Sequence, residues 1–100
     1  MPPLTRPPGS SFDGSRAWTL HPQVSLRPES FGALAYHFGT RRLSFLKSRT
    51  LLAVVESLAE HPTGHDACRA VGVSHDEMAR YELALTTLAE SGMICEREAS

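Results

Sequence analysis

Three short runs of alternating residues lie between positions 24 and 47, and helical patterns follow them at once. The runs cover residues 24–28, 33–38 and 42–46, and alternation with a period of two is typical of β-strands. No fourth run follows the third, so the sheet ends there with backbone N–H and C=O groups open on its edge. An open edge promotes aggregation unless it is protected or used, and one use is to bind an extended peptide as an added strand.

The second and third runs form a predicted hairpin with one buried face. Gly39-Thr40 is the predicted turn, because glycine readily adopts the positive φ that tight hairpin turns need. Leu46 falls on the opposite face of the third strand. Pro28 has no N–H to donate, so the first strand ends there or lies at an edge of the sheet. The large residues that share the predicted buried face are Leu34, Tyr36, Phe38, Leu43 and Phe45.

Two helix signals follow the sheet. Ser48 is a favourable N-cap for a helix that continues through Glu60 and carries a wide apolar stripe at helical spacing. Thr63, with Asp66 three residues later, begins a short second helix that Gly72 ends.

A third helix begins at the capping box of Ser74 and Glu77 and ends at about Ser91, before Gly92. Residues 93–94 are candidates for a short terminal strand. The strands precede the helices in the order β-β-β-α-α-α, so the sequence predicts an α+β fold with a three-stranded antiparallel sheet followed by three helices.

The length of 100 residues suits one small domain with a modest core. Residues 1–17 are rich in Pro, Gly and Ser and predict a disordered tail, residues 18–95 form the predicted domain, and residues 96–100 form a flexible C-terminus. No apolar run is long enough for a membrane span, and no secretory signal core is visible. These features predict a cytoplasmic protein in which Cys68 and Cys95 are free thiols rather than a disulfide.

Opposite charges separate into the two halves of the chain, although the net charge is −1. Residues 1–55 hold seven Lys/Arg and two Asp/Glu, whereas residues 56–100 hold three and nine. Arg41, Arg42 and Lys47 place positive charge on both sides of the predicted edge strand. This charge either protects the open edge from unwanted pairing or attracts an acidic partner, and the two roles are compatible.

The sequence contains no motif that predicts catalysis. No serine lies in a nucleophile motif, and there is no glycine-rich phosphate loop. His61, His65 and Cys68 lie close together, but Pro62 interrupts the helical spacing of the histidines, and two ligands are too few for a structural zinc. The sequence therefore predicts no enzyme, no metal site and no cofactor.

The second half also looks like a helix-turn-helix followed by the start of a wing, as in DNA-binding regulators. In that interpretation the helix from His75 enters the major groove. Three acidic residues, Asp76, Glu77 and Glu82, accompany a single Arg80 on this helix. They oppose the interpretation, because DNA affinity comes largely from Lys and Arg. A winged-helix transcription regulator is thus the alternative function, and a subunit that binds only another protein is a third.

Strand addition explains the open edge and its basic flanks together. The third strand would pair with an extended peptide, and the last helix would form the second wall of a groove. Tyr81, Leu85 and Leu88 are equally consistent with core positions, because most apolar stripes on helices pack inward. The candidate contacts on the helix are Tyr81, Ala84, Leu85 and Leu88.

The run from Leu20 to Pro62 strongly resembles the mycofactocin biosynthesis peptide chaperone family. The densest match consists of FGALAY at residues 31–36 and TRRLSFLK at residues 40–47. This family is related to the pyrroloquinoline quinone peptide chaperone and to other elements that recognise precursors of modified ribosomal peptides. The resemblance covers residues 18–95, and in the helical half it is a generic winged-helix pattern.

The resemblance implies a winged-helix-like, non-catalytic adaptor, and the charge pattern and the lack of an apolar run separately predict neither a nucleic-acid nor a membrane partner. Such an adaptor binds the leader of a precursor peptide and presents it to a radical S-adenosylmethionine maturase, which carries the iron–sulfur chemistry. On this chain the leader would add to the third strand and lie against the third helix. The implied peptide-binding residues are Arg41, Arg42, Leu43, Ser44, Phe45, Leu46 and Lys47 in the strand and Arg80, Tyr81, Ala84, Leu85 and Leu88 on the helix.

Overall fold

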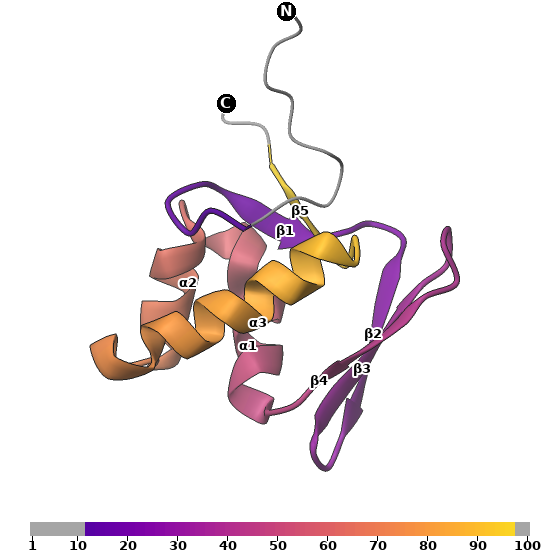
Figure 1. The fold of residues 1–100 in the computed structure, drawn as a ribbon, viewed down its shortest axis with the longest axis horizontal. Coiled ribbons are helices and arrows are strands. Elements are labelled where there is room, and N and C mark those ends of the chain that lie inside the picture. The colour runs from indigo at the N-terminus through magenta and orange to yellow at the C-terminus, as the bar shows by residue number, and fades with distance from the viewer. Residues whose placement is uncertain (1–11, 98–100) are drawn as a thin grey trace, which may run out of the picture.

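The computed structural model describes residues 12–97, in which a three-stranded sheet lies to one side of the helices (Figure 1). Within that range the chain forms five strands, three α-helices and two single-turn 3₁₀ helices. The strands are β1 (Trp18–Leu20), β2 (Val24–Glu29), β3 (Gly32–His37), β4 (Leu43–Leu46) and β5 (Ile94–Glu96). The helices are α1 (Arg49–Ser57), η1 (Leu58–Glu60), α2 (Gly64–Val71), η2 (His75–Glu77) and α3 (Met78–Glu90).

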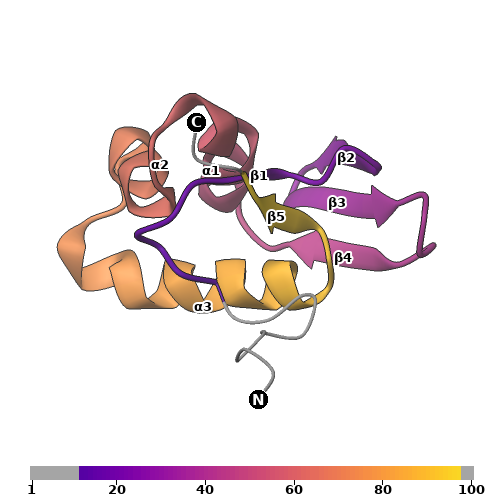
Figure 2. The ribbon, with the colours of Figure 1, turned by 90° about the horizontal axis from the view of Figure 1, so that it is seen from above.

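The strands form two antiparallel sheets. β2, β3 and β4 make the larger sheet in that order, and β1 pairs with β5 in a two-stranded ribbon. The helices lie on one side of the larger sheet, so the α+β architecture is confirmed (Figures 1 and 2). The simple order β-β-β-α-α-α is wrong, because β1 precedes the three strands and β5 follows the helices. The winged-helix likeness stays a prediction.

Local capping signals place the helices. Ser48 and Thr63 each accept a hydrogen bond from a backbone N–H in the first turn of α1 and α2. Ser74 and Glu77 form the predicted capping box, although the turn that it begins is η2, and α3 follows from Met78. The left-handed Gly72, with φ of 105°, ends α2 as predicted.

The hydrophobic core lies between the helices and the sheet, and it holds β4 in place. Leu46, at the end of β4, is completely buried. Burying one leucine side chain contributes about 1.5–3 kcal/mol, so this residue anchors a strand of only four residues. The other largest buried side chains are Val54, Val55, Leu58, Cys68, Leu85, Met93 and Ile94.

The two faces of the three-stranded sheet are the reverse of those predicted. The small residues Ala33 and Ala35 face the helices and are 0% and 1% exposed. Because their side chains are short, β3 packs closely against α1. The prediction of a buried face built from large residues is therefore wrong. The large residues that face away from the helices are Leu34, Tyr36, Phe38, Leu43 and Phe45.

The turn between β3 and β4 lies where predicted, but its residue in the left-handed conformation is an arginine and not the predicted glycine. Arg41 has φ of 63°, and Gly39 has no positive φ. The Arg41 N–H donates to the His37 carbonyl, and the His37 N–H donates to the Arg42 carbonyl, which makes a β-bulge. The buried His37 ring completes the turn, because its Nδ1 accepts hydrogen bonds from the Gly39 and Thr40 N–H groups.

The predicted flexible ends are described only in part. Residues 1–11 and 98–100 lie outside the described residues. Residues 12–17, the rest of the predicted tail, run beside the start of α2, where the His65 N–H donates to the Gly14 carbonyl. The described part of this segment therefore has defined contacts with the domain.

Candidate functional site

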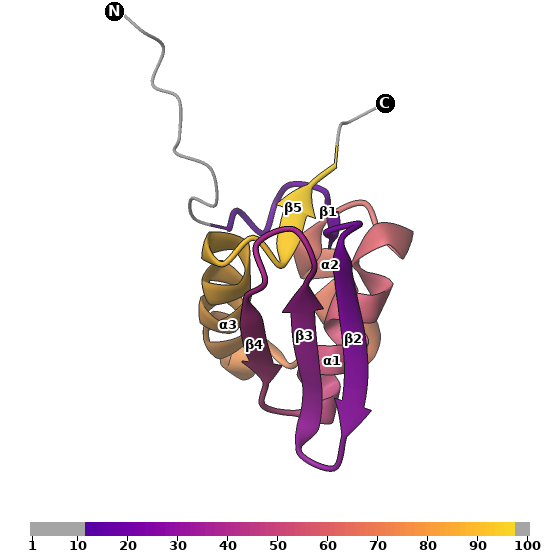
Figure 3. The same ribbon diagram turned by 90° about the vertical axis from the view of Figure 1, so that its right-hand side faces the viewer.

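The open edge predicted for the third strand of the sheet is present in the structure. Within residues 12–97, β4 pairs with β3 on one side and with no strand on the other. In Figures 2 and 3, α3 is the helix next to the unpaired side of β4. The structure thus brings the two predicted halves of the site, the edge strand and the last helix, next to each other.

Leu43 and Phe45 supply the backbone groups that face this open edge. In an antiparallel pair, successive residues alternate between bonding to the partner strand and pointing away from it. The hydrogen bond from the His37 N–H to the Arg42 carbonyl sets the phase of this alternation. Ser44 therefore bonds to β3, and the N–H and C=O groups of Leu43 and Phe45 point outward.

The side chains of β4 lie in three different environments. Leu46 is buried in the core, and Ser44 is half-buried on the same face. Leu43 and Phe45 are exposed on the opposite face, at 59% and 60%. A peptide at the edge would therefore meet the backbone of these residues rather than the side chain of Leu46.

Positive charge lies at both ends of β4. Arg41 and Arg42 precede the strand, Lys47 follows it, and all three side chains are exposed. None of the three forms an ion pair with another residue between positions 12 and 97. Their charge is therefore available to an external anionic group.

The predicted helical wall divides into surface and core residues. Tyr81 and Ala84 are half-buried on α3. Leu85 and Leu88 are only 0% and 3% exposed and belong to the core, which was the alternative that the sequence left open. These two residues lie in the core beneath the predicted helical wall.

Two exposed residues complete this side of α3. Arg80 donates a hydrogen bond to Glu77, and its guanidinium carbon lies 5.8 Å from the centroid of the Tyr81 ring. Leu83 was not predicted, although it is 69% exposed. The signal for Leu83 was an apolar residue outside the apolar stripe of its own helix, which indicates a surface position.

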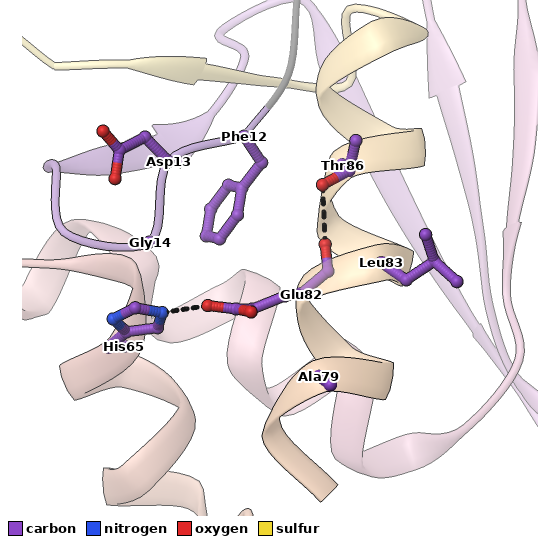
Figure 4. A pocket seen from close by; sticks show the side chains of 8 residues that line it. All are labelled: Phe12, Asp13, Gly14, His65, Ala79, Glu82, Leu83 and Thr86. Carbon is purple, nitrogen blue, oxygen red and sulfur yellow. Dashed lines mark hydrogen bonds and ion pairs between the residues drawn. The ribbon is translucent and has the colours of Figure 1, made fainter.

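A separate pocket of about 540 Å³ lies between residues 12–14, α2 and α3 (Figure 4). His65 on α2 contacts the carboxylate of Glu82 on α3, and Phe12 covers one side. None of the predicted peptide-binding residues lines this pocket. Leu83, on the exposed side of α3, also lines the pocket.

Both cysteines lie within the described residues, and burial raises the pKa of each thiol. Cys68 is buried and Cys95 is half-buried, and both are free, as predicted. Burial, and to a smaller extent the charge of Glu82, raises the pKa of Cys68 to about 11, so this thiol is neutral at physiological pH. No group of three His, Cys, Asp or Glu among residues 12–97 could hold a metal ion. No helix in this range is long and apolar enough to cross a membrane.

Known proteins resemble the chain over most of its length. Peptide chaperone MftB of Mycobacterium ulcerans (strain Agy99) is 61% identical over 89 residues, which cover 89% of this chain and 82% of that protein. Peptide chaperone MftB of Mycobacterium tuberculosis (strain ATCC 25618 / H37Rv) is 55% identical over 93 residues, which cover 93% and 85%. No solved structure matches significantly.

The names of these relatives describe a non-catalytic role, in agreement with the prediction that the chain is not an enzyme. The profile of the peptide chaperone MftB family matches residues 17–95, which include the whole predicted domain. Together with the high identity of the relatives, this match confirms the family that the sequence resembles. The chain belongs to the peptide chaperone MftB family.

Proposed function

We propose that this protein is a non-catalytic peptide chaperone of mycofactocin biosynthesis. It binds the leader of the precursor peptide as an added strand beside β4 and delivers the peptide to a radical S-adenosylmethionine maturase in the cytoplasm. The observation that supports this function most directly is the open edge of β4 next to α3. Family membership supports a peptide as the ligand, because the relatives are named peptide chaperones.

Backbone pairing alone is too weak to hold the leader. Leu43 and Phe45 each offer one N–H and one C=O, and one backbone hydrogen bond contributes about 0.5–1.5 kcal/mol net. These groups together contribute about 2–6 kcal/mol, whereas association costs at least about 4 kcal/mol in lost motional freedom. Side chains must therefore supply the remaining affinity and most of the specificity.

The face of α3 beside the edge supplies apolar contacts. Tyr81 and Ala84 are half-buried, and Leu83 is exposed, so a leader strand on this side covers their remaining surface. Leu85 and Leu88 keep this face rigid from the core. A leader with apolar residues at alternate positions fits this wall, because alternate side chains of a strand share one face.

Charge at the ends of β4 selects the leader and speeds its binding. Arg41, Arg42 and Lys47 are exposed and attract carboxylates of the leader. Arg80 contributes less, because Glu77 already accepts a hydrogen bond from it. We therefore expect the leader to carry Asp or Glu near the ends of the paired segment.

Duplex DNA is a weaker candidate ligand. The turn that a winged-helix regulator would bring to DNA carries the exposed Asp76 as well as Glu77, and Glu77 engages Arg80. Carboxylates near phosphates oppose binding. These contacts support the peptide over the transcription-regulator alternative.

Calorimetric titration tests the proposed function. The protein is titrated with the synthetic precursor peptide from the same genome, and a random duplex DNA serves as the control. We expect saturable peptide binding and no heat from DNA. Salt-sensitive DNA binding without peptide binding would favour the regulator. Binding to the maturase alone, with no peptide binding even in its presence, would favour a subunit that binds only another protein.

A further inference from the structure

An apolar patch covers the side of the three-stranded sheet that faces away from the helices. No described element covers this side (Figure 3). Four of its side chains are between 46% and 60% exposed, and two are half-buried between them. Large apolar patches are uncommon on monomeric proteins and mark interaction sites. We call this patch the outer face, and it consists of Phe31, Leu34, Tyr36, Phe38, Leu43 and Phe45.

The outer face is continuous and ordered by contacts among its own rings. The Phe31 and Phe45 ring centroids lie 6.1 Å apart, and those of Tyr36 and Phe38 lie 5.3 Å apart, edge to face. The register places Leu43 directly opposite Tyr36. Rings held in this way lose little conformational entropy on binding, and aromatic residues dominate the energetics of interfaces.

In β3 the small residues face the helices, and the large residues face outward. Ala33 and Ala35, at 0% and 1% exposure, occupy the inner positions of β3, while Leu34 and Tyr36 occupy the outer positions. The short side chains of Ala33 and Ala35 fit the narrow space between β3 and α1, so the larger residues of the strand face solvent. A large exposed apolar patch of this kind is typical of an interaction site.

The outer face and the open edge are separate surfaces of the same strand. In β4, the backbone groups of Leu43 and Phe45 point along the sheet toward α3, whereas their side chains project perpendicular to it. A protein on the outer face therefore leaves the edge free. Both surfaces can be occupied at the same time.

The charges around the outer face favour a different protein over a second copy of this chain. Arg27 lies opposite Leu34 on this face, and Lys47 follows Phe45. Glu29 is the one acidic residue between positions 24 and 47, and it pairs with Arg27. Because Glu29 offsets Arg27, the uncompensated charge is that of Lys47, and a two-fold dimer through this face would place two such cations in one interface, which is unfavourable.

We propose that the outer face is the docking surface for the modifying enzyme, which contacts it through an apolar patch rimmed by carboxylates. This inference rests on the proposed function, which requires an enzyme to hold the chaperone while the leader occupies the edge. The alternation of β4 then separates the two tasks: its backbone binds the substrate, and the outward side of the strand binds the enzyme.

A double variant outside the edge strand tests this surface. Phe31→Ser with Phe38→Ser removes two exposed rings without changing β4. The probes are the purified radical S-adenosylmethionine maturase and the synthetic precursor peptide, each titrated separately against the full-length protein. We expect enzyme binding to weaken by about tenfold or more, and peptide binding to stay within about twofold. The pair Phe31→Leu with Phe38→Leu should restore most of the enzyme affinity.

Leu83→Gln is the matched control, because it removes an exposed apolar side chain from α3 and should weaken peptide binding alone. Unchanged enzyme affinity in the serine variant overturns the inference. So does sedimentation that shows a wild-type dimer and a monomeric variant, because a second copy would then cover the face. If the wild-type protein binds peptide but no enzyme, the docking surface is wrong and peptide binding stands. If it binds the enzyme through this face but no peptide, the proposed function fails and the docking surface stands.

Discussion

Gly32 and Leu46 approach each other so closely that no side chain fits between the start of β3 and the end of β4. A Cβ atom on Gly32 would lie 2.0 Å from the Leu46 carbonyl oxygen and 2.8 Å from the Ser48 nitrogen. Gly32 also has φ of 151°, a conformation that other residues rarely adopt. This contact positions the edge strand and the start of α1 together.

Gly32→Ala should therefore destabilise the protein by about 2–4 kcal/mol, because strain and a backbone clash act together. Urea unfolding followed by circular dichroism measures the free energy of unfolding. Gly72→Ala is the control, since Gly72 has φ of 105° but nothing within 4 Å of an added Cβ. It should cost only about 1–2 kcal/mol, the strain alone. Equal losses of unfolding free energy in the two variants would show that the close approach of Gly32 to Leu46 adds nothing to the cost of the substitution.

Arg41 is the second backbone position that can be tested directly. Its φ of 63° places a long side chain where a bulge of this kind usually has glycine. Arg41→Gly should be more stable than Arg41→Ala by about 1 kcal/mol, because both variants lose the charge and only alanine keeps the strain. Thermal unfolding of the two variants gives this difference. If alanine is as stable as glycine, residue 41 does not adopt the left-handed conformation in solution.

Local chemistry accounts for what the sequence predicted well. Ser48, Thr63 and Ser74 are caps whose partners lie within three residues, so their patterns are visible without tertiary information. β1 was not predicted, because Trp18–Leu20 has no clear alternation and pairs with β5, more than 70 residues away. Such pairing depends on the whole fold.

The candidate site shows the same division. Alternation predicted the strands and the open edge, but alternation alone does not indicate which face of the sheet is buried. Ala33 and Ala35 face α1, because the buried face is determined by the space between sheet and helix rather than by residue size. Leu85 and Leu88 are core for a related reason, since a helical stripe alone does not distinguish a groove from an interior.

Replacement of Phe45 by proline tests the open edge itself. Phe45→Pro removes an N–H that points away from β3, so the sheet should keep its fold while peptide affinity falls by about tenfold or more. Phe45→Thr keeps that N–H and should bind peptide within about threefold of wild type. Calorimetric titration with the precursor peptide compares the two.

Ser44→Pro, unlike Phe45→Pro, should destabilise the fold. The Ser44 N–H bonds to β3, so proline at this position should lower the free energy of unfolding by at least about 1 kcal/mol. Normal peptide binding by folded Phe45→Pro would show that the leader does not pair with β4.

Arg42→Glu tests the electrostatic part of peptide recognition. Reversing an exposed charge beside the edge should weaken peptide binding by about three- to tenfold at low salt, and the remaining affinity should depend less on salt. Arg69→Glu is the control, because Arg69 is an exposed arginine on α2, where it pairs with Asp66. Titrations at two salt concentrations distinguish the variants. An Arg42→Glu protein with wild-type affinity and wild-type salt dependence would show that the charge of Arg42 does not contribute to binding of the leader.

The buried thiol of Cys68 gives a prediction about pH. Burial raises its pKa from the ordinary 9.0 to about 11, so the folded state retains a proton that the unfolded state loses. The stabilisation is complete below about pH 9 and is lost as the pH rises toward 11. The free energy of unfolding should therefore fall over this range.

Cys68→Ala isolates this contribution from the other groups that titrate at high pH. The variant should be less stable at pH 7 by about 1 kcal/mol, because it leaves a small cavity, but its stability should decline less steeply between pH 9 and 11. Urea unfolding at several pH values gives both slopes. Parallel slopes for the wild type and the variant would mean that the Cys68 thiolate forms as easily in the folded as in the unfolded protein.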